Sequence, residues 1–194
     1  MRKNLLLCGP IGCGKSTLIR MALGADAARA GGYVTLRIHQ EQKLLGFDLA
    51  PAAALADPQA LEQAQRFLDF TGNQKQDSSV FSGHGVRLLQ EALESPFAVA
   101  DEFGGVELLI PELRSALTQL LYSPVPCIGV LKDLDASRSL ARRMRLGPEY
   151  RDEYDALFQK LKRDPNTMIL RTTGRYDSFA QRQIDLWAGE FVRK

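Results

Sequence analysis

The chain has 194 residues, of which 45% are hydrophobic and 25% are charged, and its formal net charge is +2. This is the composition of an ordinary globular protein, and its length suits one domain over residues 1–194. The small net charge predicts neither nucleic-acid binding nor a membrane-surface partner, and no apolar run approaches the roughly 18 residues of a membrane span.

The N-terminal part alternates short apolar strands with a helix. A buried strand at 5–8 precedes a helix at 15–23, in which apolar residues recur at helical spacing. Residues 31–38 and 43–49 alternate in polarity and are rich in β-forming residues. The polar turn between them predicts an antiparallel hairpin.

The middle of the chain begins with a helix signal. Asp57 followed by Pro58 predicts the start of a helix that continues to Leu68. Residues 71–79 predict a loop, and residues 82–93 predict a further helix.

The remaining elements continue the alternation. We expect strands at 97–100, 126–131 and 167–173, and helices at 111–122, 135–163 (divided at Gly147-Pro148) and 176–191. Buried strands that alternate with helices predict an α/β fold, a mostly parallel central sheet covered on both faces.

The cysteines give an expectation about the compartment. Cys8, Cys13 and Cys127 have no disulfide or metal-site spacing, which favours a reducing environment. The basic pair and short apolar run at the N-terminus lead directly into a glycine-rich motif and are not read as a signal peptide. We therefore expect a cytoplasmic protein.

The stretch GPIGCGKS, residues 9–16, matches the phosphate-binding pattern G-x-x-x-x-G-K-[ST] between a strand and a helix. Its glycines let backbone N–H groups surround a phosphate at the positive end of a helix. Lys15 is expected to reach the β- and γ-phosphates, and the Ser16 hydroxyl to bind Mg²⁺. The predicted nucleotide-binding residues are Gly9, Pro10, Ile11, Gly12, Cys13, Gly14, Lys15, Ser16 and Thr17.

Two adjacent acids end the apolar strand at 97–100. Asp101 is the expected partner of Ser16 in holding Mg²⁺. Glu102 is expected to orient or deprotonate a water that attacks the γ-phosphate. Lys15 and Glu102 are thus the predicted catalytic residues, and Ser16 and Asp101 the predicted metal ligands.

Together with the stretches GGYVTLRI, LLGFDL, VADEFGGVEL and VPCIGVLKD, these motifs resemble the THEP1 family of nucleoside-triphosphatases over about residues 3–132. The resemblance implies a P-loop NTPase fold, a three-layer α/β/α sandwich with a RecA-like sheet. It also implies slow, Mg²⁺-dependent hydrolysis of ATP, GTP and other nucleoside triphosphates with little base preference. By the same match Glu107 becomes a candidate active-site acid, and Lys132 a candidate phosphate contact.

The residues alone leave other functions open. The arginine-rich segment 136–163 is typical of a solvated helix face, but it also fits the lid of a nucleotide or small-molecule kinase, with Arg142 or Arg143 as an arginine finger. Tyr33, Thr35 and Arg37 fit either an acceptor site or the alternation of a half-buried strand. A nucleotide-dependent switch or assembly module is the third hypothesis. The sequence does not identify a protein partner.

Overall fold

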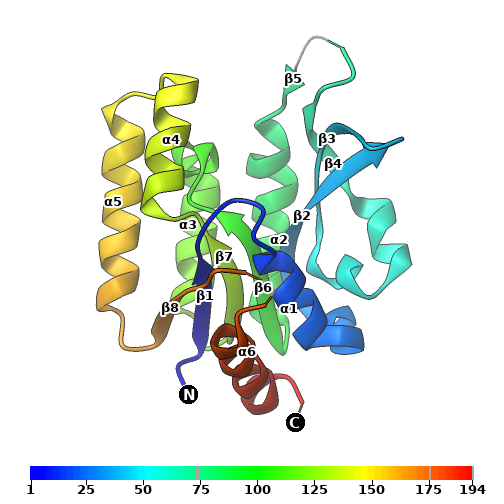
Figure 1. The fold of residues 1–194 in the computed structure, drawn as a ribbon, viewed down its shortest axis with the longest axis vertical. Coiled ribbons are helices and arrows are strands. Elements are labelled where there is room, and N and C mark those ends of the chain that lie inside the picture. The colour runs from blue at the N-terminus through cyan, green and yellow to red at the C-terminus, as the bar shows by residue number, and fades with distance from the viewer. Residues whose placement is uncertain (73–74, 175, 194) are drawn as a thin grey trace.

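Over the residues that the structure describes, the strands form one eight-stranded sheet, and helices cover it (Figure 1). The computed structural model describes residues 1–72, 75–174 and 176–193. The strands are β1 (Asn4–Cys8), β2 (Ala30–Gln40), β3 (Lys43–Pro51), β4 (Gln65–Asp69), β5 (Lys75–Gln76), β6 (Phe97–Phe103), β7 (Cys127–Leu131) and β8 (Thr167–Arg171). The helices are α1 (Lys15–Leu23), α2 (Val86–Glu91), α3 (Pro111–Tyr122), α4 (Leu134–Met144), α5 (Pro148–Arg163) and α6 (Ser178–Phe191).

The sheet has a parallel and an antiparallel part. Its strand order is β5-β4-β3-β2-β6-β7-β1-β8. Strands β2, β6, β7, β1 and β8 pair in parallel, whereas β3, β4 and β5 add antiparallel neighbours beyond β2. The predicted mostly parallel sheet with an antiparallel hairpin is confirmed.

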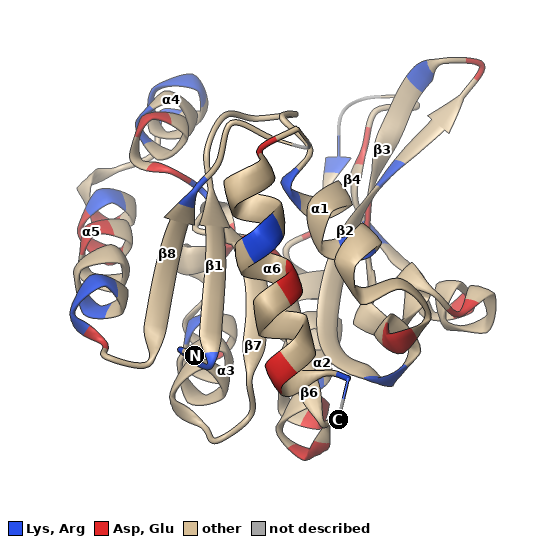
Figure 2. Cartoon of the chain, turned by 60° about the horizontal axis from the view of Figure 1, so that its bottom comes forward, with Lys and Arg blue, Asp and Glu red and all other residues tan. Residues whose placement is uncertain are grey.

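Helices cover both faces of the sheet. One hydrophobic core packs α1 and α6 against one face, and a second core packs α2, α3 and α5 against the other. The central strands β1 and β7 carry no charged residue and are fully buried, as strands between two helical layers must be. Figure 2 accordingly draws the charged residues mainly on the helices and on the outer strands.

The predicted helix at 57–68 is wrong in its second half. Asp57 does begin a helical segment, because its carboxylate accepts the Gln59 N–H at 2.9 Å, but this 3₁₀ segment (Pro58–Gln63) is short. Strand β4 follows and pairs with β3, and Phe67 lies 4.8 Å from Phe81 between ring centroids. Pairing with a free sheet edge therefore outweighs the local helical pattern.

Smaller boundaries also differ. The predicted loop at 71–79 includes the short strand β5, and residues 73–74 lie outside the described residues. The predicted helix at 82–93 exists as a π-helical segment (Phe81–Gly85), α2 and a 3₁₀ turn (Ala92–Glu94). The division at Gly147-Pro148 is confirmed by α4 and α5.

Trp187 fastens the last helix to the sheet. Its side chain is fully buried, it meets Phe97 of β6 edge-on at 6.3 Å, and its indole N–H donates to the Lys3 carbonyl at 2.9 Å. This one residue therefore joins α6 to β6 and to the chain segment that leads into β1.

Replacing Trp187 with alanine is expected to lower the free energy of unfolding by about 3–5 kcal/mol, because it leaves a large cavity between α6 and the sheet. Urea denaturation measures this. The neighbouring Leu186, which is 53% exposed, is the matched control. Leu186→Ala is expected to change stability by at most about 0.5 kcal/mol, and equal losses in both variants would contradict this account.

Candidate active site

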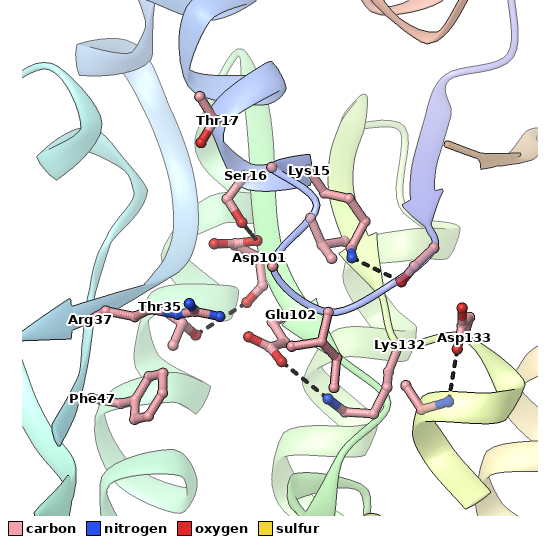
Figure 3. A pocket seen from close by; sticks show the side chains of 16 residues that line it. Lys15, Ser16, Thr17, Thr35, Arg37, Phe47, Asp101, Glu102, Lys132 and Asp133 are labelled. Carbon is pink, nitrogen blue, oxygen red and sulfur yellow. Dashed lines mark hydrogen bonds and ion pairs between the residues drawn. The ribbon is translucent and has the colours of Figure 1, made fainter. Parts of the chain in front are cut away.

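A cleft opens at the carboxyl edge of the parallel strands (Figure 3). Its lining comes from the β1–α1 loop and the first turn of α1, from β2 and β3, from the end of β6, and from the chain between the end of β7 and the start of α4. The lining residues are Gly9, Ile11, Gly12, Gly14, Lys15, Ser16, Thr17, Thr35, Arg37, Phe47, Asp101, Glu102, Val130, Lys132, Asp133 and Ala136. All the predicted catalytic and metal-binding residues thus meet in one cleft.

The β1–α1 loop has a backbone that glycine alone accommodates well. Gly9 adopts φ 146°, and a Cβ there would lie 2.2 Å from the Thr172 carbonyl oxygen. Gly14 caps α1 with φ 100°, in the left-handed region. The loop therefore turns tightly against the β8–α6 segment and presents the free N–H groups of the first turn of α1 to the cleft.

Lys15 folds back on this loop. Its ammonium donates to the carbonyls of Gly9 at 2.9 Å and Pro10 at 2.7 Å, and lies 3.8 Å from the Cys13 sulfur. A lysine satisfied by its own loop can exchange those carbonyls for phosphate oxygens, which are stronger acceptors.

Ser16 and Asp101 are in direct contact. The Ser16 hydroxyl donates to Asp101 Oδ1 at 2.8 Å, joining the start of α1 to the end of β6. Asp101 is 4% exposed, and burial raises the pKa of its carboxyl to about 6, although the hydrogen bond from Ser16 lowers it. The hydrogen bond from Ser16 thus offsets only part of the cost of burying this carboxylate, and a neighbouring cation would stabilise it further.

A β-bulge turns Glu102 in another direction. Ala100 pairs with Gly129 and Phe103 with Leu131, so two residues of β6 oppose one residue of β7. Glu102 has φ 62°, which is uncommon for a residue other than glycine. The bulge allows two consecutive acids to have separate surroundings.

The Glu102 carboxylate meets Lys132. The Lys132 ammonium lies 3.1 Å from Glu102 Oε1, with the glutamate side chain 43% exposed and the lysine side chain 11% exposed. In the view of Figure 3 this pair lies below the Ser16–Asp101 contact. Glu102 lies on β6 and Lys132 directly follows β7, so two neighbouring strands supply the pair.

The donors fit a magnesium ion that also binds phosphate. Mg²⁺ prefers oxygen ligands and takes one or two from the protein, with waters and substrate phosphates completing the octahedron. Ser16 and Asp101 supply such oxygens 2.8 Å apart. No cluster of three or more His, Cys, Asp or Glu side chains suited to a metal occurs in the described ranges 1–72, 75–174 and 176–193.

Some predicted residues lie beside the cleft without lining it. Pro10 and Cys13 belong to the loop and contact the Lys15 ammonium through the Pro10 carbonyl and the Cys13 sulfur. Glu107 is 6% exposed, and its carboxylate accepts the Gly105 N–H at 2.6 Å. It holds the turn after β6 and, in this structure, does not line the cleft.

The two candidate arginine fingers do not reach the cleft here. Arg142 and Arg143 are exposed in the last turn of α4, whereas the cleft is lined only by Ala136 of that helix and by its capping residue Asp133. Of the three candidates on β2, Tyr33 is buried in the core, and Thr35 and Arg37 line the cleft.

Several lining residues are not predicted from the sequence. Phe47, Val130, Asp133 and Ala136 belong to this group. Asp133 could have been predicted as an N-cap, because an acid just before a helix is typical of a cap. Its carboxylate accepts the Ala136 N–H at 2.8 Å. Phe47 lines the cleft because of where β3 places it in the sheet, which local sequence signals do not predict.

Comparison with known proteins identifies the family. A family model described as NTPase matches residues 4–152, more than half of the chain. The chain belongs to the NTPase family. The match runs from β1 into α5 and so contains the phosphate-binding loop, both acids and Lys132. It confirms the predicted resemblance and supports nucleoside triphosphate hydrolysis.

Two solved structures share the fold of this NTPase family member. THEP1 from the hyperthermophile Aquifex aeolicus has a TM-score of 0.61 at 16% identity, covering 95% of this chain and 98% of its own. The solution structure of a human cancer-related nucleoside triphosphatase has a TM-score of 0.51 at 18% identity, covering 83% of this chain and 98% of its own. These matches confirm the P-loop NTPase fold. A search of curated proteins found no match.

The helices give one finding on membranes. Within the described residues, none of them combines the length and the apolar character that a membrane crossing requires.

Replacing Asp101 with asparagine is expected to stabilise the metal-free protein and to abolish its response to Mg²⁺. A carboxyl pKa raised from 3.8 to about 6 means that the buried charge costs about 3 kcal/mol at pH 7, and the amide removes that charge. Urea denaturation with EDTA and with Mg²⁺ measures both effects. Asp155→Asn, at an exposed position on α5, should behave as the wild type. A variant at Asp101 that Mg²⁺ stabilises as strongly as the wild type would refute the assignment.

Proposed function

We propose that this protein is a Mg²⁺-dependent nucleoside-triphosphatase that transfers the γ-phosphate of ATP, GTP and other nucleoside triphosphates to water. The observation that carries the proposal is the contact of Ser16 with Asp101 at 2.8 Å beside a glycine-rich loop. The residue after Asp101, Glu102, has a partly exposed carboxylate. Membership of the NTPase family supports the same reaction.

The loop binds the phosphates. Its backbone N–H groups and the positive end of α1 attract the β-phosphate. Lys15 leaves the Gly9 and Pro10 carbonyls and donates to the β- and γ-phosphate oxygens. Lys15 and the loop residues 9–17 are therefore the proposed nucleotide-binding residues.

Ser16 and Asp101 are the proposed protein ligands of Mg²⁺, which when bound neutralises charge on the phosphates. Ser16 is exposed at the start of α1, so its hydroxyl oxygen is accessible from the cleft. The buried Asp101 carboxylate gains most from a neighbouring cation.

Glu102 is the proposed water-orienting residue. Its carboxylate is anchored on one side by Lys132, and 43% of its side chain faces solvent. It can accept a hydrogen bond from a water in the cleft while the positive φ of its backbone keeps it clear of Ser16. The γ-phosphate competes with Glu102 for the Lys132 ammonium, which frees the carboxylate to act on the water.

The base is proposed to be recognised weakly. Discrimination between bases requires hydrogen-bond donors and acceptors matched to their edges. The described residues that line the cleft include no Asn, Gln or His side chain. This composition supports a broad base preference.

Two further expectations accompany the function. Cys8, Cys13 and Cys127 are free thiols, which supports the proposed cytoplasmic location. One sheet runs through residues 4–171, which supports the proposal of one domain.

Glu102→Gln is expected to lower kcat for Mg-ATP by about 10²–10⁴-fold and to leave nucleotide affinity almost unchanged, because the amide keeps the shape and loses the base. Phosphate release and calorimetric binding measure the two effects. Glu94→Gln, at an exposed position before β6, is the matched control and should keep full activity. Lys15→Ala should lose binding as well as turnover.

The same assay separates the alternative functions. Release of phosphate from Mg-ATP by the protein alone supports hydrolysis. Turnover that begins only when an acceptor is added would favour a kinase. Negligible turnover with a nucleotide-dependent change of size in light scattering would favour a switch or assembly module.

The values of kcat/KM for ATP, GTP, CTP and UTP are expected to agree within about tenfold, since no Asn, Gln or His side chain lines the described cleft. Steady-state phosphate release with each nucleotide measures this. A preference of about 10³-fold or more for one base would contradict broad specificity.

A further inference from the structure

Arg37 is a cation in the cleft that the proposed reaction has not used. It lies on β2 and enters the cleft from the side opposite Lys132 (Figure 3). It shares its strand face with Thr35, two residues earlier, whose hydroxyl donates to the Asp101 backbone carbonyl at 3.4 Å. Strand β2 is therefore fixed directly beside the proposed metal-binding acid.

The position of Arg37 brings its guanidinium within reach of the phosphates. Two residues of a strand span about 6.6 Å, so the Arg37 backbone lies about that far beyond Thr35 along β2. An extended arginine side chain covers a similar length and can return to the region between Ser16 and Glu102. Both of these residues line the same cleft as Arg37.

The charges of the cleft leave Arg37 without an anion. Lys15 donates to loop carbonyls, and Lys132 pairs with Glu102. Asp48, which follows the cross-strand partner of Arg37 on β3, pairs instead with Arg66 of β4. Among the described residues no ion pair to Arg37 occurs. The guanidinium is thus available for an anion that enters the cleft.

Phe47 holds the guanidinium in place. The Arg37 and Phe47 residues pair directly across β2 and β3, and the Arg37 Cζ lies 5.9 Å from the ring centroid. Phe47 itself packs against Phe67 and Phe70, with ring centroids 6.1 Å and 6.2 Å away. An aromatic surface of this kind orients the planar group and leaves its N–H edges free to donate.

We propose that Arg37 is a catalytic residue that contacts the γ-phosphate and stabilises the charge of the transition state, held ready by Phe47. This inference rests on the proposed function and assigns the role of an arginine finger to the same chain. Arginine suits the role because its fork donates to two phosphate oxygens at once. Arg142 and Arg143, the candidates from the sequence, do not line the cleft.

Hydrolysis of the γ-phosphate requires no proton from Arg37. A bond forms between the water oxygen and the γ-phosphorus, and the bond from that phosphorus to the bridging oxygen breaks. The nucleoside diphosphate leaves with the electron pair, and Glu102 accepts the proton of the water. Arg37 donates hydrogen bonds to the γ-phosphate oxygens throughout and stays protonated.

Arg37→Ala, Arg37→Lys and the control Lys43→Ala test the inference. Lys43 lies on the same hairpin, is exposed, and does not line the cleft, so its loss changes the net charge equally. Arg37→Ala is expected to lower kcat for Mg-ATP at least about 100-fold with a small change in KM. Arg37→Lys should recover less than about a tenth of the lost rate, because an ammonium cannot donate as a fork. Lys43→Ala should match the wild type.

A second readout measures binding alone. With ADP and aluminium fluoride, which mimics the transition state, Arg37→Ala is expected to lose about 100-fold in affinity by calorimetry, and with ADP it should bind as the wild type. Equal affinity of the wild type and Arg37→Ala for the analogue overturns the inference, whether or not the wild type turns over. A change in KM with kcat unchanged in Arg37→Ala, or a defect seen only with an added acceptor, would also overturn the inference. A wild type that releases no phosphate but binds the analogue through Arg37 would refute the proposed function and retain this contact.

Discussion

The hydrogen bond from Ser16 to Asp101 is the interaction on which the rest of the site depends. It joins the first turn of α1 to the end of β6, although β7 lies between β1 and β6 in the sheet. A carboxylate that is 4% exposed is tolerated there because it accepts this bond and faces the place where a cation can bind. The cost of burying this carboxylate is thus the counterpart of the proposed affinity for magnesium and for the phosphates that accompany it.

Two backbone features make that contact possible. Gly9 passes so close to Thr172 that a side chain would not fit, which brings the loop over the sheet edge. The bulge in β6 directs Asp101 toward α1 while its neighbour Glu102 points into the cleft at φ 62°. Without the bulge, strict alternation would send one of the two acids to each face of the sheet and only one could serve the cleft. Local strain in β6 therefore separates the acid proposed to bind metal from the acid proposed to orient water.

The sequence predicts the parts of this site that depend on local chemistry. The glycine-rich loop and the acids after a buried strand could be recognised because their spacing follows from phosphate and metal binding, and the THEP1 resemblance is confirmed by the NTPase family match. The helix expected at 57–68 fails because β4 pairs with β3, a contact between segments that periodicity does not detect. The Glu102–Lys132 pair and the position of Phe47 over the cleft also depend on how β6, β7 and the hairpin meet. Charge alone made Arg142 and Arg143 candidates in the sequence. The role proposed for Arg37 depends instead on its pairing with Phe47 across β2 and β3.

Water is the proposed acceptor of the γ-phosphate, and oxygen-isotope transfer tests this most directly. Mg-ATP is turned over by the purified protein in water enriched in ¹⁸O, and the products are examined by ³¹P NMR. Attack by water on the γ-phosphorus predicts inorganic phosphate with one oxygen from water, and ADP with none. Label in the ADP, or a phosphorylated acceptor in place of inorganic phosphate, would contradict it.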